Sequence, residues 1–163
     1  LFAKLAENPE ADYDTLVQDF MDNVFGPASD EVHKFYEDLR NHFTWMGTTA
    51  GNYCFRNFNN YGQNWSNKRF WPYERLQSFS DTLSAAQQKI DESDLSETEK
   101  KTVSDRINNL DMYIEYWLLR WYDSYYTQAE FDERWAKFVA DCEYFGITNT
   151  NIFDATITLT PRS

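Results

Sequence analysis

Residues 96–126, SETEKKTVSDRINNLDMYIEYWLLRWYDSYY, decide the fold of this chain. The stretch contains neither proline nor glycine. Its apolar residues recur in alternating steps of four and three, at Val103, Ile107, Leu110, Ile114, Trp117 and Trp121. This spacing places one apolar stripe along one side of an α-helix. Ser96 and Glu99 have the spacing of a capping box, which marks the start of a helix of about thirty residues.

The second half of this predicted helix is apolar on nearly every side. It contains Tyr113, Ile114, Tyr116, Trp117, Leu118, Leu119, Trp121, Tyr122, Tyr125 and Tyr126. A helix that is apolar all round is normally buried all round. We therefore expect an exposed apolar patch on the isolated chain. We also expect an adjacent domain of the same parent protein to cover it, through Tyr116, Leu119, Tyr122 and Tyr126.

Helical periodicity also marks the segments on either side. Residues 72–90 and 131–145 carry apolar side chains in the same steps of three and four. Thr127 and Glu130 form a second predicted capping box. Three shorter helices are expected in the first 46 residues. The pairs Asn8-Pro9 and Gly26-Pro27 separate them. The core side of the third helix is predicted to contain Val32, Phe35, Tyr36, Leu39, Phe43 and Met46.

These patterns predict an all-α fold, an up-down bundle of about five to six helices. We expect one domain, 1–163, that is a piece of a longer protein. Its predicted parts are N-terminal helices in 1–46, an irregular loop in 47–71, a helical hairpin in 72–126, a last helix in 127–146 and an extended tail in 147–163.

The irregular segment 47–71 shows neither helical nor strand periodicity, and it interleaves asparagines with aromatic residues. Such a long irregular segment in a compact domain is often functional. Tryptophan and tyrosine rings can stack on the apolar faces of sugars, while amide groups bond to the sugar hydroxyls. The segment therefore predicts a carbohydrate-binding set, Tyr61, Asn64, Trp65, Asn67 and Trp71. The alternative is that these rings fill a gap between helices or face a neighbouring domain.

The composition of the chain argues against two classes of binding partner, nucleic acids and anionic membranes. The formal net charge of -12 disfavours a nucleic-acid surface and binding to anionic membranes, since both carry negative charge. No apolar run approaches the ~20 residues that a membrane span needs. Aromatic residues make up 18% of the chain, which indicates a folded protein. Of the two cysteines, Cys142 lies on a helical apolar stripe and is predicted to be a buried free thiol. The alternative is a disulfide between Cys54 and Cys142, whose geometry the sequence does not fix.

Few residues suggest catalysis. His33 and His42 are nine positions apart on one predicted helix, which is not a facing interval for two metal ligands. We find no phosphate-binding loop or hydrolase motif, and we predict neither a cofactor nor a metal. Glu115 lies among aromatic residues and has two interpretations. It is either an acid with a raised pKa or the partner of Arg120 or Arg134 in a structural ion pair.

The first forty residues resemble a known family. The resemblance lies in Ala3-Lys4-Leu5, Asn8-Pro9-Glu10-Ala11-Asp12, Leu16, Asp19-Phe20 and Phe25-Gly26-Pro27-Ala28. These motifs are similar to the helical region that follows the barrel in an uncharacterised, Bacteroidetes-type family of secreted bacterial proteins. Those barrels look like the barrels of alpha-glucuronidases and hexosaminidases. The family often has two tyrosines where Val24 and Phe25 stand in this sequence.

The resemblance implies a secreted or periplasmic parent protein that acts on carbohydrates, with its catalytic carboxylates in the barrel and none in this chain. We therefore expect a non-catalytic helical accessory domain that packs on the barrel and helps to shape a glycan cleft. The alternative is a stand-alone glycan-binding or protein-interaction module. An independent helical glycosidase is disfavoured, because a double-ring barrel needs about twelve helices and the sequence predicts half that number.

Overall fold

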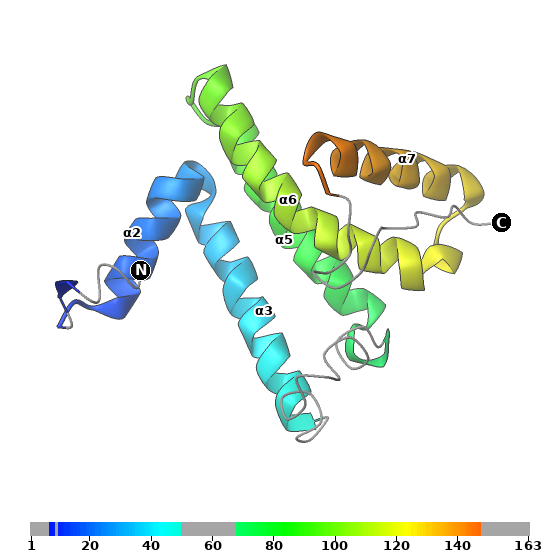
Figure 1. Cartoon of the computed structure of the whole chain (residues 1–163), viewed down its shortest axis with the longest axis horizontal. Coiled ribbons are helices and arrows are strands. Elements are labelled where there is room, and N and C mark those ends of the chain that lie inside the picture. Colours follow the sequence, from blue (N-terminus) through cyan, green and yellow to red (C-terminus); the bar gives the residue numbers. More distant parts are fainter. Residues whose placement is uncertain (1–6, 9, 50–67, 148–163) are drawn as a thin grey trace. The chain divides into compact units, whose positions relative to one another are not determined.

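The computed structural model describes residues 7–8, 10–49 and 68–147 (Figure 1). These residues are almost entirely helical and contain no strand, which confirms the predicted all-α class, with the helix number at the low end of the prediction. The α-helices are α2 (Tyr13–Phe25), α3 (Ser29–Thr49), α5 (Tyr73–Asp91), α6 (Glu97–Trp121) and α7 (Gln128–Tyr144). Short 3-10 turns are η1 (Gly26–Ala28), η4 (Lys68–Phe70) and η5 (Asp123–Tyr125).

The chain divides into two compact units, which cover residues 1–110 and 111–163. The predicted single domain therefore contains two packing units, with α6 running through the boundary. The predicted irregular segment 47–71 is helical at its first three residues and again in η4, and its central part lies outside the described residues. The same holds for the predicted extended tail beyond Ile147.

The first unit begins with a tight joint between α2 and α3. The side chain of Asp12 accepts a hydrogen bond from the backbone N–H of Thr15 at 2.7 Å and caps the start of α2. Gly26 ends α2 at a φ of +52°, a conformation that other residues adopt only under strain. Pro27 then fits the first turn of η1, and α3 follows directly.

The core of the first unit lies where α3 packs on α5. The buried residues of α5 are Leu76, Phe79, Leu83, Ala86 and Ile90, the same stripe that the sequence predicts. On α3, Val32, Phe35 and Met46 are buried as predicted, and the Phe35 ring meets the Phe79 ring edge-on at 5.7 Å. Tyr36 differs from the prediction because it is exposed, although its ring meets the buried Phe35 ring edge-on at 5.5 Å.

Polar contacts fix the joint between α5 and α6. The side-chain amide of Gln87 donates to the Ser104 hydroxyl at 2.7 Å, and Lys100 Nζ donates to the Asp91 carbonyl at the end of α5. The backbone N–H of Ser96 donates to the Glu99 carboxylate at 2.9 Å, which confirms the first capping box.

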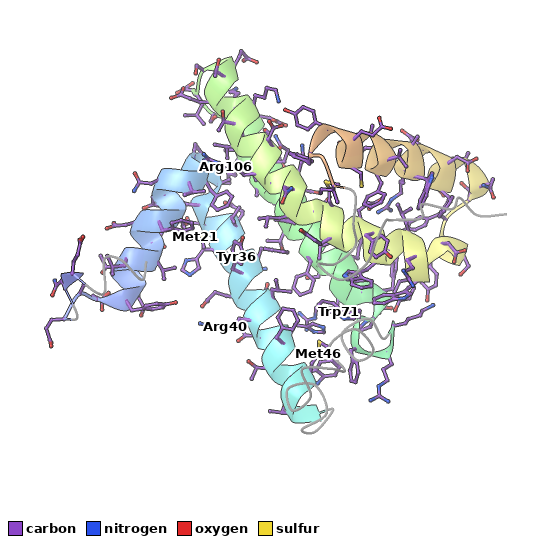
Figure 2. All side chains as sticks on the ribbon, viewed as in Figure 1. Met21, Tyr36, Arg40, Met46, Trp71 and Arg106 are labelled. Carbon is purple, nitrogen blue, oxygen red and sulfur yellow. The ribbon has the colours of Figure 1, made fainter. Side chains whose placement is uncertain are left out.

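A second contact links α6 to the beginning of the chain. Arg106, in the first half of α6, donates a hydrogen bond to the backbone carbonyl of Val24, in the last turn of α2 (Figure 2). The last carbonyls of a helix have no partner within the helix, and a cation beside them is also favoured by the helix dipole. Arg106 therefore completes the end of α2 from a distant part of the sequence.

The helix α6 is shorter than the predicted helix of about thirty residues. The helix ends at Trp121 and has 25 residues, because Tyr122 leaves the helical region with φ −127° and ψ 23°. The carboxylate of Asp123 then accepts the N–H of Ser124 at 2.8 Å, and η5 turns the chain toward α7. This turn brings the apolar stripe of α7 onto α6, where Phe131, Phe138 and Cys142 are buried with Met112 and Leu119.

The second unit has its own apolar core. Its buried members are Met112, Leu119, Phe131, Phe138 and Cys142, and half-buried Tyr116, Tyr126, Trp135, Phe145 and Ile147 pack against them. The predicted capping box of Thr127 and Glu130 opens α7, and Cys142 is a buried free thiol as predicted.

The core of the second unit contradicts the expected exposure of the four residues that were predicted to contact an adjacent domain. Leu119 is 3% exposed and Tyr122 is 6% exposed, so the chain itself covers them. Tyr116 and Tyr126 are half-buried in the core of the second unit. A neighbouring domain is therefore not needed to bury these four residues. The physical reason is that α7 folds back onto α6, which helical periodicity alone does not reveal.

Candidate functional site

Trp71 is the member of the predicted carbohydrate-binding set that the structure describes. Its side chain is 5% exposed, and its ring lies 4.6 Å from the His42 ring and 5.7 Å from the Phe43 ring (Figure 2). A stacking platform needs an open ring face, whereas this ring belongs to the core of the first unit. Tyr61, Asn64, Trp65 and Asn67 lie outside the described residues, and their role in binding stays a prediction.

The aromatic cluster around Trp71 contains a buried histidine. His42 is 5% exposed, and its ring stacks on Trp45 at 5.4 Å and meets Phe79 edge-on at 5.9 Å. Burial lowers the pKa of His42 to about 4, with a smaller contribution from the positive charge of Arg75. The imidazole is therefore neutral at pH 7.

The two histidines occupy different environments. His33 lies with one ring nitrogen 3.3 Å from the side-chain oxygen of Gln18, whereas His42 lies among aromatic rings. In the described ranges no three His, Cys, Asp or Glu side chains gather in a group that could hold a metal ion. His42 follows Phe35 by seven positions on the buried side of α3, so its place in the apolar stripe was the sequence signal of its burial.

Glu115 forms the predicted structural ion pair. Two nitrogens of the Arg134 guanidinium donate to its two carboxylate oxygens, and the first of these bonds is 2.8 Å long. The side chains are 16% and 31% exposed, and the guanidinium also lies 4.4 Å from the centre of the Tyr126 ring. A paired carboxylate of this kind is held as an acceptor, so the ion-pair interpretation is confirmed over that of a free acid.

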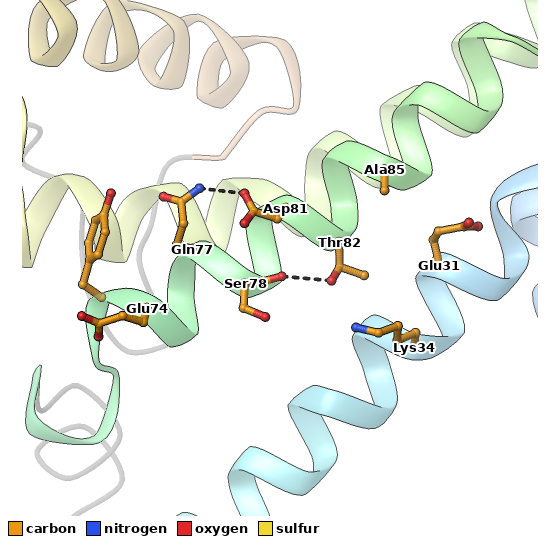
Figure 3. A pocket seen from close by; sticks show the side chains of 9 residues that line it. Glu31, Lys34, Glu74, Gln77, Ser78, Asp81, Thr82 and Ala85 are labelled. Carbon is orange, nitrogen blue, oxygen red and sulfur yellow. Dashed lines mark hydrogen bonds between the residues drawn. The ribbon is translucent and has the colours of Figure 1, made fainter.

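An open groove of about 490 Å³ lies between α3 and α5 (Figure 3). It is lined by Glu31, Lys34, Tyr73, Glu74, Gln77, Ser78, Asp81, Thr82 and Ala85. Several of these polar groups already bond along their own helix. Gln77 donates to Asp81 at 2.8 Å, and Lys34 donates to Asp38 at the same distance. The groove therefore combines charges of both signs, of which Lys34 is paired with Asp38 and Glu31 lies 3.8 Å from Lys89 Nζ.

A second open hollow, of about 590 Å³, lies along α3 and was not predicted. Its lining follows the helical steps of three and four, at Tyr36, Leu39, Arg40, Phe43, Thr44, Gly47 and Thr48. The helical spacing predicts core positions for Tyr36, Leu39 and Phe43. The apolar stripe of α3 is wider than the surface that α5 covers, and its outer edge lines this hollow.

Aromatic residues on α2 and α3 are also exposed. They are Tyr13, Phe20, Tyr36 and Trp45. Tyr13 and Phe20 are seven positions apart and therefore lie on the same side of α2, two turns from one another. Phe20 belongs to the motif that carries the family resemblance, and it is 45% exposed. Tyr113, Tyr125 and Tyr144 are exposed in the second unit.

Comparison of the chain with protein-family models, with curated proteins and with solved structures finds no match. No helix among the described residues is long and apolar enough to cross a membrane.

Proposed function

We propose that this chain is a non-catalytic helical accessory domain of a carbohydrate-active protein, and that it packs on an adjacent domain of the same protein through the outer side of α2 and α3. The observation that carries the proposal is the exposure of Phe20. The resemblance of residues 1–40 supplies the class of the parent protein. The same resemblance supports a secreted or periplasmic parent.

Four described residues of the resembling motif have a role within the chain. Asp12 caps α2, Gly26 provides the positive φ at its end, and Phe25 and Ala28 are buried in the joint with α3. Phe20 has no such role, because nearly half of its side chain is in water. Exposed aromatic side chains are common anchors of interfaces, since burying them on a partner gains apolar contact area. Tyr13 extends the apolar surface along the same side of α2.

The test starts from the coding sequence next to this chain. If it encodes a barrel with paired carboxylates, the barrel and this chain are produced separately and titrated against each other by calorimetry. Phe20→Ser should weaken binding about tenfold, equivalent to about 1.4 kcal/mol. Tyr144→Ser is the matched control, since Tyr144 is 59% exposed but lies in the second unit. Equal affinities of the two variants, or an adjoining sequence without a carbohydrate-active domain, contradict the proposal.

We also propose that the accessory domain contacts glycan. The support is the composition of segment 50–67, which interleaves asparagines with aromatic residues. Titration of the full chain with oligosaccharides tests this part. Trp65→Ala should remove binding. Trp71→Phe should lower the melting temperature and leave binding unchanged, because Trp71 packs in the core. If Trp65→Ala binds like the unchanged chain, the carbohydrate-binding set is wrong.

The proposal further expects no turnover of aryl glycosides by the chain alone. The assay uses the purified full chain, and Glu115→Gln serves as a control for contaminating glycosidases. Turnover that survives purification and disappears in a variant of this chain makes it an enzyme in its own right.

A further inference from the structure

His42 lies where three elements of the first unit meet. The ring is on α3, and it contacts Trp71, which follows η4, and Phe79, on α5. Trp45 stacks on the ring from the next turn of α3. The imidazole therefore belongs to the apolar joint that holds η4 and the beginning of α5 against α3.

The buried Nε2 of His42 suits only the neutral form of the ring, whereas the bond to the Phe70 carbonyl is compatible with both forms. A neutral imidazole has one N–H, and the backbone carbonyl of Phe70 is in place to accept it. Nε2 is buried and has no partner among the described residues. In the neutral ring this nitrogen is an unused acceptor. Protonation would make it a charged donor that is buried without an acceptor, which is far more costly.

The charged groups around the ring do not compensate for a positive charge. On α5 the nearest is Arg75, which has the same sign as a protonated imidazole. Lys68 and Arg69 on η4 are also cations. On α3, Asp38 is one turn from His42, but it is bonded to Lys34 at 2.8 Å. Glu74 of α5 lines the groove shown in Figure 3.

We infer that His42 makes the joint of α3, η4 and α5 an acid-sensitive contact, which opens when the imidazole gains a proton and which releases Trp71 from α3. Opening lets water reach the ring and gives Nε2–H an acceptor. His33 does not take part, because its ring already lies beside Gln18 and is only half-buried.

The pH window follows from the direction of the pKa shift. The pKa of His42 is about 4 in the closed joint and about 6.5 in an open one, so the open joint binds more protons between these values. The stabilisation by neutral His42 is complete above pH 6.5 and is lost as the pH falls toward 4. Between pH 7.5 and pH 5 the opening constant should rise about 30-fold.

The test is hydrogen exchange of the full chain at pH 7.5 and pH 5, read by mass spectrometry and corrected for the intrinsic exchange rate. Peptides from residues 38–48 and 68–79 should show the increase, and peptides from α7 should show a much smaller one. His42→Phe keeps an aromatic ring and should remove the pH dependence. His33→Phe is the matched control and should keep it.

A second measurement does not depend on a variant that folds. The imidazole proton signals of the unchanged chain are followed by NMR during an acid titration, and His42 should titrate near pH 4, well below 6.5. The inference is wrong if His42 titrates near 6.5, or if His42→Phe retains the 30-fold change in opening.

Discussion

Gly146 shows how one residue ends a helix and closes a core. Its φ is +65°, and the N–H of Ile147 donates to the Cys142 carbonyl at 2.8 Å, across the end of α7. This is the hydrogen bond of a Schellman motif, which also brings the next residue back onto the helix. Ile147 accordingly packs against the core cluster of the second unit.

Gly146→Ala should lower the free energy of unfolding by about 1 kcal/mol, because an L-residue is strained at this φ. A Cβ at this position would meet no atom within 4 Å, so the cost comes from the backbone alone. Urea unfolding followed by circular dichroism measures the change. Gly146→Asn is the control and should lose less, since asparagine tolerates this conformation. Equal losses for both variants would exclude backbone strain as the cause.

The ion pair of Glu115 and Arg134 gives a second prediction at this scale. Glu115→Ala should cost about 1 to 3 kcal/mol of stability, because it leaves a half-buried guanidinium without its bidentate acceptor. A double-mutant cycle with Arg134→Ala in urea separates the coupling from the packing of each side chain. A coupling free energy of zero would show that the pair contributes only through packing against Tyr126.

Helix ends in this chain are set partly by local signals and partly by packing. The starts of α6 and α7 were predicted, because a capping box needs only two residues three positions apart. The end of α6 was not predicted, since the apolar period continues past Trp121 and no proline or glycine interrupts it. The position where that helix stops depends on α7, which folds back from farther along the chain.

Thr127→Ala should destabilise the second unit by about 1 kcal/mol, because its side chain accepts the N–H of Glu130 at the start of α7. In the other direction, the Thr127 hydroxyl and backbone N–H donate to the Glu130 carboxylate and lower its pKa. The stabilisation by these two bonds is present above the usual pKa of Glu130 and is lost as the pH falls through the lowered value. Thermal unfolding at pH 7 measures the effect. Thr102→Ala, in the second turn of α6, is the matched control. If the control loses as much stability, the cap is not the cause.

The fold class of the whole molecule could be predicted from the sequence, but the sides of its helices that stay exposed could not. Helical periodicity is a local property, so the all-α fold and the core stripe of α5 were readable from the sequence. Which face of a helix stays open depends on elements that are distant in sequence. Leu119 is therefore buried where an open surface was expected, and Tyr36 is exposed where a core position was expected. The same reason applies to Trp71 of the predicted carbohydrate-binding set. Its aromatic ring could stack on a sugar, but packing in the fold buries it.

The division into two compact units predicts separate responses to core mutations. Phe138→Ala removes a buried side chain of the second unit, a change that typically costs about 3 to 5 kcal/mol. Hydrogen exchange should therefore increase in α7 while α2 and α3 keep their protection. Leu83→Ala is the reciprocal variant and should affect α3 and α5 first. Uniform loss of protection in both variants would show that the two units unfold as one.

The bond from Arg106 to the Val24 carbonyl also bears on how this protein is made. A ribosome releases α2 long before it releases Arg106, which follows 82 positions later in the sequence. Until then water must hydrate the last carbonyls of α2, and the nascent helix can fray at that end. Completion of the amino-terminal helices is thus coupled to synthesis of the first half of α6.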